Sequence, residues 1–285
     1  MKLINPLPKD ASYLYHYTSV DTALNYILKN RTLKFNPFNA VNDPREKKEW
    51  DISPFVRMGL NLELKQYDAI SREISDLLKS NAKMVCFCRD KDEAIGQWQP
   101  EALFNRGFSK PNMWHHYGNE HKGICLMFDR NKLNNAFQKR LKKDRLVSGK
   151  VTYSNKGIIP NIVNDPFVIN LMSVTDNNSY INAIQGHMNL WFKELFLTKL
   201  VDWANEDEYR WIYLDDNSEP IYVDFEDALV AVVIGEGFAS ERTKEILRYC
   251  VIHEADVAIL NWRNGFPVIN NPGQPYMTHK HLLDE

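Results

Sequence analysis

The start of the fold is decided by the stretch Leu14-Tyr15-His16-Tyr17-Thr18-Ser19. In a strand, His16 and Thr18 would share one face, and the two tyrosines would share the other. Because Ser19 is a typical helix N-cap, we expect a strand over 13–17 and a helix over Val20–Lys29. A histidine at this break could donate a hydrogen bond to a sugar hydroxyl while a nearby ring stacks on a heterocycle. A core strand in which the backbone satisfies His16 is the commoner arrangement, since short aromatic strands are frequent.

The bulk composition is that of an ordinary globular protein. The chain has 285 residues, of which 44% are hydrophobic and 25% charged, and its net charge of −2 means that it is not a polycation. A contact with nucleic acid must therefore come from a local patch. We expect no membrane contact, because no stretch approaches the roughly 20 apolar residues of a membrane span and no signal peptide is evident. Four cysteines without framework spacing favour a cytoplasmic location.

The spacing of apolar residues predicts the other elements. We expect strands over 32–35, 82–88, 123–128, 150–153, 208–214, 229–234 and 257–260. We expect helices over 62–78, 129–141, 181–200 and 240–249, with irregular chain over 36–46 and 154–180 and in a Pro- and Asn-rich tail from residue 263. Strands and helices mix without a steady βαβ order, which predicts an α+β fold. Without a convincing linker, residues 1–285 are expected to form a single domain with a helical insertion around 154–205.

A second group of polar residues lies at the start of a predicted late strand, in Glu206-Asp207-Glu208-Tyr209-Arg210. Glu206 and Glu208 would point the same way and repel each other, so we expect one of them to have a raised pKa. A carboxylate aimed at a sugar 2′-hydroxyl could stabilise an oxocarbenium-like centre at the adjacent anomeric carbon. The other carboxylate would suit a base or a substrate-orienting group. A surface ion pair between Glu208 and Arg210 is the commoner arrangement.

An aromatic-rich turn over 112–118 contains Trp114 and Tyr117 and could line a pocket for a base or a nicotinamide ring. The nearby histidines and cysteines lack the spacing of metal ligands, so we expect no metal site. These residues are His115, His116, His121, Cys86, Cys88 and Cys125.

The segment 232–240 is nearly a dinucleotide-binding fingerprint, with an apolar strand followed by G-x-G-x-x-S. The third glycine is missing, however, and Glu236 would repel a pyrophosphate. We therefore expect a tight turn from strand to helix at this position.

A basic strip runs from Arg130 to Lys150, with eight basic residues against one acidic residue. It is a candidate for contact with a phosphate backbone, although a solvated helix face is the commoner origin of such a strip. The candidate nucleic-acid-binding residues are Lys139, Arg140, Lys142 and Lys143.

Several motifs together resemble a widespread bacterial family of domains of unknown function that is grouped with the ADP-ribosyltransferase superfamily. They span residues 14–235 in a fairly specific order, although each motif alone is weak. The motifs are L-Y-H-Y-T-S at 14–19, T-L-K-F at 32–35, N-D-P-x-E at 42–46, M-W-x-x-Y at 113–117 before G-I-C-L at 123–126, and E-x-E-x-R at 206–210.

The resemblance implies a split β-sheet with flanking helices that grips NAD. His16 matches the histidine that holds a ribose, and Glu208 matches the glutamate that contacts the nicotinamide ribose. Glu206 matches a glutamate that in some members orients or activates the acceptor. Tyr17 or Tyr117 would stack on nicotinamide, and both remain open. Where related sequences often end the Cys-Phe-Ser strand with serine, this chain has Cys88, which puts a catalytic hydroxyl there in doubt.

The implied activity is transfer of ADP-ribose from NAD to a macromolecular acceptor, either protein or nucleic acid. The implied setting is a bacterial toxin or phage-defence effector, and whether an antitoxin or regulatory partner exists stays open. The expected NAD contacts are His16, Tyr17, Thr18, Trp114, Tyr117 and Arg210.

The alternatives are an NAD glycohydrolase that uses the same residues, a catalytically inactive module that binds a nucleotide or nucleic acid, and a structural domain. The enzyme hypothesis requires His16, Tyr117 and Glu208 to converge on one cleft.

Overall fold

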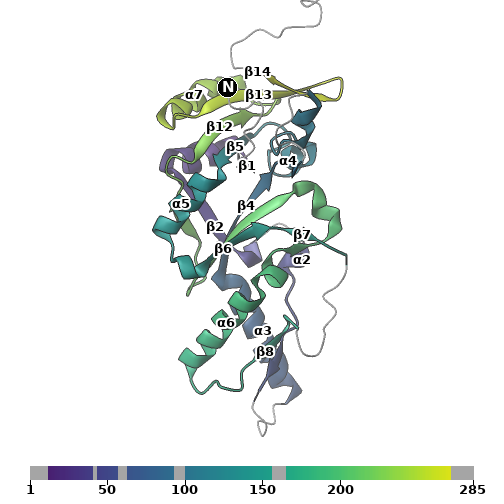
Figure 1. Ribbon diagram of the computed structural model, residues 1–285, viewed down its shortest axis with the longest axis vertical. Helices are drawn as coiled ribbons and strands as arrows, with labels where there is room; N and C mark the ends of the chain where they lie inside the picture. Colours follow the sequence, from purple (N-terminus) through teal and green to yellow (C-terminus); the bar gives the residue numbers. More distant parts are fainter. Residues whose placement is uncertain (1–11, 41–43, 57–62, 93–99, 156–164, 271–285) are drawn as a thin grey trace, which may run out of the picture.

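A mixed sheet with helices on both faces forms the centre of the molecule (Figure 1). The computed structural model describes residues 12–40, 44–56, 63–92, 100–155 and 165–270. Within these ranges the fold is mixed α/β, and ten strands join in one sheet. Its main path is β11 (Ile221–Asp224), β2 (Thr32–Pro37), β4 (Ala82–Arg89), β1 (Tyr13–Thr18), β5 (Ile124–Asp129), β12 (Leu229–Ile234), β13 (Asp256–Arg263) and β14 (Phe266–Asn270). Off this path, β10 (Glu208–Leu214) pairs with β4 and with β6 (Leu146–Lys150).

The opening stretch folds as its pattern predicts. β1 is followed by one α-helical turn, α1 (Val20–Thr22), and then by a π-helix over Ala23–Leu28. The Ser19 hydroxyl accepts a hydrogen bond from the backbone N–H of Thr22 at 3.1 Å, which confirms the predicted cap.

The sheet divides beside the middle of β4. One side of β4 pairs with β10 from Ala82 to Cys88. On its other side, Cys88 and Arg89 pair with β1, whereas Lys83 and Met84 pair with β2. Residues 85–87 have no strand partner on that side among the described residues, because β1 and β2 diverge there. The divergence leaves a gap at which side chains from several strands can meet.

Two hydrophobic cores cover the faces of this sheet. On one face lie the π-helix, α5 (Arg130–Arg140) and α7 (Thr243–Ile252), which contribute Leu24, Phe137 and Ile246. On the other face, α4 (Pro111–His116) packs Trp114 over Tyr15 and Tyr17. The aromatic face of β1 is therefore a core face.

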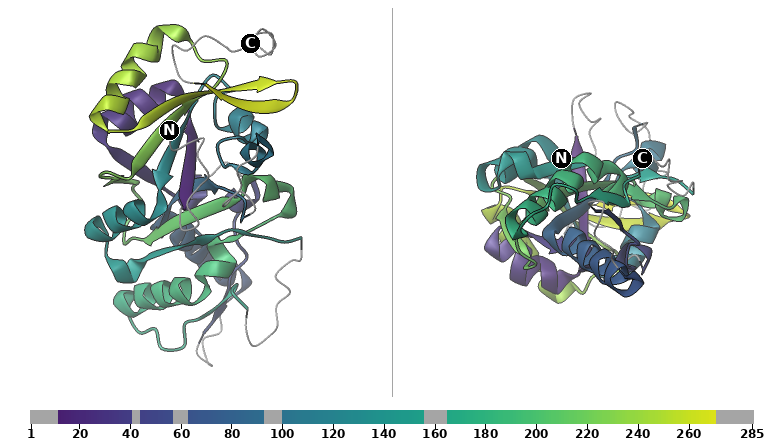
Figure 2. Two further views of the ribbon diagram at one scale, coloured as in Figure 1. Left: turned by 45° about the horizontal axis from the view of Figure 1, so that its top comes forward. Right: turned by 90° about the horizontal axis from the view of Figure 1, so that it is seen from below.

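A third core lies at the lower end of the molecule (Figures 1 and 2). Here α3 (Leu64–Asn81) and α6 (Asn177–Phe196) pack together beside the short parallel pair β3 (Ser53–Phe55) and β8 (Val168–Asn170). The remaining elements are α2 (Pro44–Lys47), β7 (Thr152–Tyr153), β9 (Thr198–Lys199), and 3-10 turns at Phe38–Ala40, Pro100–Asn105, Lys143–Arg145, Val201–Glu206 and Ser240–Arg242. None of the described helices has the length and apolar character needed to cross a membrane.

Several element predictions need correction. The strand expected over 150–153 is two strands, β6 and β7, and the expected aromatic turn contains α4. The helix expected over 181–200 begins at Asn177, because Asp176 and Ser179 form a capping box, and it ends at Phe196. β3, β8, β9, β11 and β14 were not expected. Residue 62, the expected start of α3, Asn42 and Asp43 of the N-D-P-x-E motif, and residues 156–164 and 271–285 lie outside the described residues.

The near-fingerprint at 232–240 is the expected turn between β12 and the helical segment that leads into α7. A Cβ atom on Gly235 would lie 2.1 Å from the carbonyl oxygen of His121, so a glycine is needed for the two backbones to approach. Glu236 accepts a hydrogen bond from the backbone N–H of Trp262 at 3.1 Å. Gly235 is therefore needed because it lets two backbone segments pack closely.

Candidate functional site

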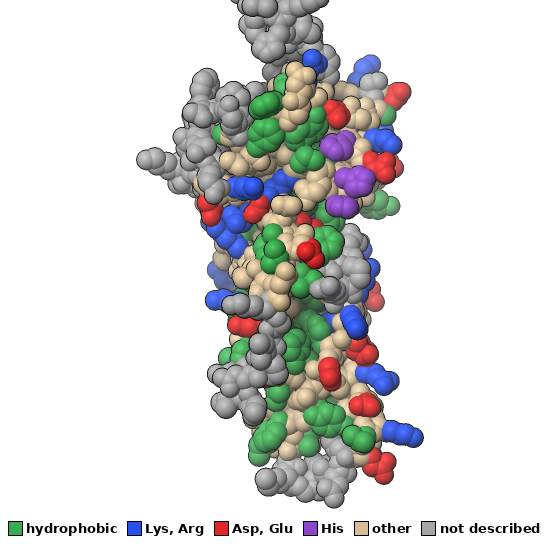
Figure 3. Space-filling view, turned by 90° about the vertical axis from the view of Figure 1, so that its right-hand side faces the viewer, with side chains coloured by type: hydrophobic (Ala, Val, Ile, Leu, Met, Phe, Trp, Pro, Cys, Tyr) green, Lys and Arg blue, Asp and Glu red, His purple; other side chains and the backbone are tan. Residues whose placement is uncertain are grey.

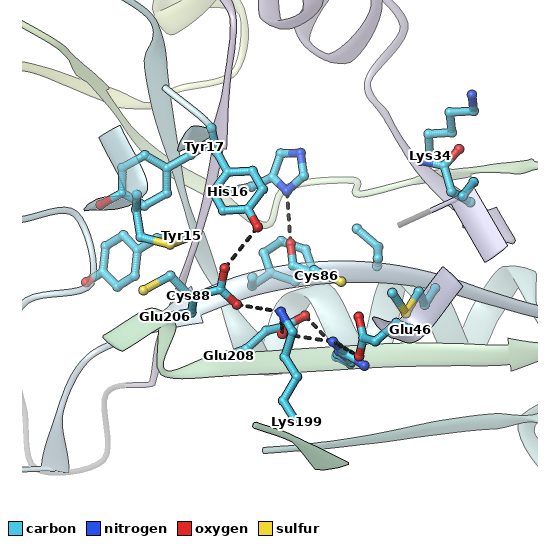
Figure 4. Close-up of a pocket in the computed structure, with 18 residues that line it drawn as sticks. Tyr15, His16, Tyr17, Lys34, Glu46, Cys86, Cys88, Lys199, Glu206 and Glu208 are labelled. Carbon is cyan, nitrogen blue, oxygen red and sulfur yellow. Dashed lines mark hydrogen bonds and ion pairs between the residues drawn. The ribbon is translucent and has the colours of Figure 1, made fainter. Parts of the chain in front are cut away.

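A cavity of about 280 Å³ lies at the division of the sheet (Figure 4). This volume is close to the lower end of the range for small-molecule sites, about 300–1,000 Å³. Its walls come from β1, β2, β4, β9 and β10, from the segment that contains α2, and from α4 with the residue that follows it. The sequence-predicted residues that line it are His16, Tyr17, Tyr117, Glu206, Glu208 and Arg210. His16, Tyr117 and Glu208 thus meet at one cavity, as the enzyme hypothesis requires.

A left-handed turn brings the two glutamates together. Asp207 adopts φ 44°, which ends the 3-10 turn at Glu206 and starts β10 at Glu208. The Asp207 carboxylate is held by Lys110 and lies 3.8 Å from Nη2 of Arg89. Aspartate tolerates this backbone region better than most residues, and the two cations hold it there. Glu206 and Glu208 can therefore both reach the same partner.

That partner is Lys199, on β9. Its Nζ lies 2.7 Å from Oε2 of Glu206 and 3.3 Å from Oε2 of Glu208, and it also sits 4.7 Å from the centre of the Trp203 ring. All three ion-pairing side chains are buried. A buried ammonium between two carboxylates compensates the repulsion that the E-x-E spacing would otherwise cause.

The expected raised pKa is wrong for Glu208. Burial alone would raise its pKa, but Arg210 and Lys199 together hold the pKa of Glu208 at about 2. The Arg210 Nε and Nη2 atoms donate to the two carboxylate oxygens at 2.7 and 3.0 Å. Glu208 is therefore a fixed negative charge across the whole physiological pH range.

Arg210 is a buried structural cation, with only 1% of its surface exposed. Besides Glu208, its guanidinium donates to the carbonyl oxygen of Phe196 at 2.7 Å and pairs with Glu46 at 2.8 Å. The sequence led us to expect a surface ion pair between Glu208 and Arg210 as the commoner arrangement. The structure contains this ion pair, but it lies in the interior. The guanidinium is occupied by protein groups, which leaves it chiefly the role of holding two carboxylates in the cavity wall.

His16 lies at the edge of the gap and bonds to the unpaired middle of β4. Its Nδ1 is 3.0 Å from the carbonyl oxygen of Cys86. A carbonyl can only accept, so Nδ1 carries the proton, and burial lowers the pKa of the ring. In this neutral form Nε2 is an acceptor. The expectation that His16 donates to a ribose hydroxyl is therefore corrected: Nε2 would accept a hydrogen bond from that hydroxyl.

The geometry separates the two candidate stacking tyrosines. Tyr17 packs edge-on against Trp114 at 5.1 Å between ring centres, and its hydroxyl donates to the carbonyl of Gly107 at 2.7 Å. Tyr117 is only partly buried, and its hydroxyl donates to Glu206 at 2.9 Å. Tyr17 belongs to a core, whereas Tyr117 has a ring at the cavity and a hydroxyl on a site carboxylate.

Two other predicted contacts lie away from the cavity lining. Thr18 is buried at the end of β1, opposite Ile124. Trp114 is fully buried, and its indole N–H donates to the carbonyl of Phe108 at 2.8 Å. Both side chains support the fold around the cavity, and neither is among the residues that line it.

The basic strip covers α5, the turn that follows it and β6, and its four candidate nucleic-acid-binding residues lie at the end of α5 and in that turn. Lys139, Arg140, Lys142 and Lys143 are exposed. Lys139 pairs with Glu226 at 2.6 Å, and two further basic residues of the strip, Lys132 and Arg145, pair with Asp227 and Asp216. The strip shares no residue with the cavity lining, so the prediction of a nucleic-acid surface is separate from the cavity.

The candidate metal-binding side chains are distributed over different parts of the fold. His115 and His116 are exposed near the end of α4, where histidine side chains gather on the surface in Figure 3. The four cysteines are free thiols in the sheet and in α7, and burial raises the pKa of each. Among the described residues, no three such side chains form a group that could hold a metal ion.

Lys199 and Glu46 are among the residues of the cavity wall for which the sequence predicted no role. Lys199 was expected at the end of a long helix, yet it lies on β9 with its ammonium between the glutamates. Glu46 belongs to the N-D-P-x-E motif, but the pattern carries no chemical role for it. A signal for Lys199 was present, because two converging buried carboxylates require a nearby cation.

The depressed pKa of Glu208 predicts an acid-sensitive fold. The unfolded carboxyl has a pKa near 4.5 and the folded one about 2, so the unfolded state binds more protons between these values. Stability from this group is complete above pH 4.5 and is lost as the pH falls toward 2. We expect the urea midpoint of the wild type to fall between pH 5 and 3, and the Glu208→Gln variant to lose part of this dependence. If the urea midpoint of Glu208→Gln fell with pH as strongly as that of the exposed control Glu241→Gln, the ion-pair assignment would be contradicted.

A family model matches part of the chain. No curated protein and no solved structure matches the chain. The matching segment runs from α4 into β10, and it contains Tyr117, Lys199 and the E-x-E-x-R residues, whereas His16 and Glu46 precede it. Residues 113–211 match the family described as a protein of unknown function (DUF2971).

Proposed function

We propose that the protein is an ADP-ribosyltransferase-like enzyme that cleaves the bond between nicotinamide and ribose in NAD and transfers ADP-ribose to a macromolecular acceptor. One observation carries the proposal: His16, Tyr117 and the two glutamates of the E-x-E motif line the same cavity. The division of the sheet between β1 and β2 also agrees with the split sheet that the sequence resemblance implies.

The charge of the cavity suits the reacting half of NAD. Its wall contains the carboxylates of Glu46, Glu206 and Glu208 and the cations of Lys199 and Arg210. With these five groups ionised their formal sum is −1, and Lys34 at the outer end of the cavity brings the whole lining to 0. The inner part of the cavity therefore favours the cationic nicotinamide ring over a phosphate group. The nicotinamide riboside half would therefore enter the cavity.

The rest of the dinucleotide would lie outside. A cavity of about 280 Å³ has room for only part of a dinucleotide. Lys34 is exposed at the end of the cavity that is farther from Tyr15 (Figure 4). Its ammonium could meet the pyrophosphate at the entrance, where solvent would screen it.

Each residue then has a defined role. Tyr117 would stack on the nicotinamide ring while its hydroxyl stays on Glu206. His16 Nε2 would accept a hydrogen bond from a ribose hydroxyl. As the bond between C1′ and nicotinamide breaks, its electron pair leaves with nicotinamide, and the fixed charge of Glu208 stabilises the positive charge on the ribose. The acceptor oxygen or nitrogen then bonds to C1′.

The direct test is incubation of the purified protein with NAD labelled separately in the nicotinamide and adenosine parts, in the presence of protein and nucleic-acid acceptors. We expect release of nicotinamide and transfer of the adenosine label to one acceptor class. We expect His16→Ala to lose most of this activity and the exposed control His115→Ala to retain it.

The other outcomes identify the alternatives. Free ADP-ribose without labelled acceptor would indicate an NAD glycohydrolase. No nicotinamide release, together with salt-sensitive binding of nucleic acid that depends on Lys142 and Lys143, would indicate an inactive binding module.

A further inference from the structure

Glu46 reaches the cavity from a wall separate from that of the other two glutamates (Figure 4). It lies on α2, and its backbone carbonyl accepts a hydrogen bond from Nζ of Lys79 at 2.8 Å. Lys79 also bonds to the carbonyl of Lys48 and sits 4.5 Å from the centre of the Trp50 ring. The segment that carries Glu46 is thus anchored to α3 through a buried lysine.

The three carboxylates of the cavity differ in how fully their oxygens are occupied. Both oxygens of Glu208 accept hydrogen bonds from Arg210. Glu206 is also engaged at both oxygens, by Tyr117 at 2.9 Å and by Lys199 at 2.7 Å. The Oε1 atom of Glu46 lies 2.8 Å from Nη2 of Arg210 in an ion pair that lacks the geometry of a well-directed hydrogen bond, so Glu46 is held less fully than the other two carboxylates. Glu46 therefore keeps the most capacity to accept a proton from a bound group.

The surroundings of Glu46 strengthen this difference. Arg210 and Glu208 face it from β10, Lys199 faces it from β9, and Lys79 holds its backbone from α3. Burial raises the pKa of Glu46, and this effect exceeds the opposing influence of Arg210 and Lys199. A less stabilised carboxylate is a stronger base than its neighbour Glu208, whose pKa is lowered to about 2. Two carboxyl groups in one site with pKa values shifted in opposite directions are suited to different tasks.

We propose that Glu46 is the general base that deprotonates the acceptor as it attacks C1′ of the ribose. This inference rests on the proposed function of the cavity. The acceptor O–H or N–H gives its proton to the Glu46 carboxylate while the acceptor atom bonds to C1′, and nicotinamide leaves with the electron pair of the broken bond. Glu46 later releases the proton to solvent. Glu206, held by Lys199 and Tyr117, is a positioning residue for these two groups and not the base.

The test compares Glu46→Gln with Glu206→Gln in the full-length protein, using NAD and the acceptor that the wild type uses, or water. We expect Glu46→Gln to lower kcat by about 100-fold or more, the usual contribution of a general base. We also expect the wild-type rate to fall at low pH, as Glu46 becomes protonated. This acid limb of the pH–rate profile should be absent in Glu46→Gln. Glu206→Gln should keep the acid limb.

Azide supplies a second readout, because it is an anionic nucleophile that needs no base. We expect added azide to restore nicotinamide release in Glu46→Gln, with formation of ADP-ribosyl azide, and to have little effect on Glu206→Gln. Glu46→Asp should keep part of the activity and the acid limb. Thermal unfolding of each variant shows whether it is folded, and the Asp variant serves as the test if the Gln variant is not.

The outcomes separate the two hypotheses. A wild-type protein that releases no nicotinamide overturns the proposed function. A wild type that turns over NAD, with Glu46→Gln retaining both its rate and its acid limb, overturns only the role of Glu46. Azide rescue confined to Glu206→Gln would assign the base to Glu206 instead.

Discussion

The Glu208→Gln variant is expected to release nicotinamide about 100- to 1,000-fold more slowly than the wild type, a loss like that caused by removing one fixed electrostatic partner of a transition state. The substitution keeps the size of the side chain but removes the negative charge that Arg210 and Lys199 hold ionised. Because the positive charge on the ribose develops only in the transition state, kcat should fall more than the affinity for NAD. The measurement is steady-state nicotinamide release over a range of NAD concentrations.

The matched control is Glu241→Gln, which changes an exposed glutamate outside the cavity lining. It should leave both kcat and KM unchanged. A Glu208→Gln variant that is folded, binds NAD and keeps the wild-type kcat would rule out the role of this carboxylate in the reaction.

The second large effect concerns stability. We expect Arg210→Met to lower the free energy of unfolding by about 3–5 kcal/mol, the usual cost of breaking a buried ion pair by removing one partner. Methionine fills a similar space, but it leaves Glu208 and Glu46 buried without the guanidinium that pairs with both of them. Urea unfolding at pH 7 measures the difference.

Arg145→Met is the matched control, since it removes a surface ion pair with Asp216. Surface pairs contribute about 0–1 kcal/mol, so this variant should stay close to the wild type. Equal losses in the two arginine variants would mean that the buried pair contributes no more than the surface one. Lowering the pH should also reduce the difference in unfolding free energy between Arg210→Met and the wild type, because protonation neutralises the buried carboxyl groups that have lost the guanidinium.

The sequence predicted much of the scaffold because the apolar periodicities there match the burial. β12 is apolar throughout and occupies its predicted bounds, and Ser19 caps the helix that follows β1. β14 was missed because its proline and its asparagine resemble a loop. The hairpin signal was nevertheless present in Asn264 and Gly265, which adopt φ values of 50° and 82° and connect β13 to β14.

The polar residues of the candidate site were only partly predictable. His16 and the E-x-E motif carry a local signal, because unusual polar residues enter predicted strands at these positions. Glu46 and Lys199 carry no such signal at their own positions, since single charged residues at the ends of helices are usually solvated. For Lys199 the only signal was indirect, because the E-x-E carboxylates require a nearby cation. The burial of both residues follows from the ion pairs that Lys199 on β9 and Glu46 on α2 form with residues of β10, and such long-range contacts leave no pattern in a single sequence.

The guanidinium of Arg210 binds carboxylates from two distant parts of the chain, Glu46 near its beginning and Glu208 in its later half. During synthesis, the N-terminal part leaves the ribosome long before β10 does. A nascent chain that ends before residue 210 lacks the cation that holds these carboxylates and the strand that pairs along β4. The order of translation itself therefore keeps the site unassembled until most of the protein has been made.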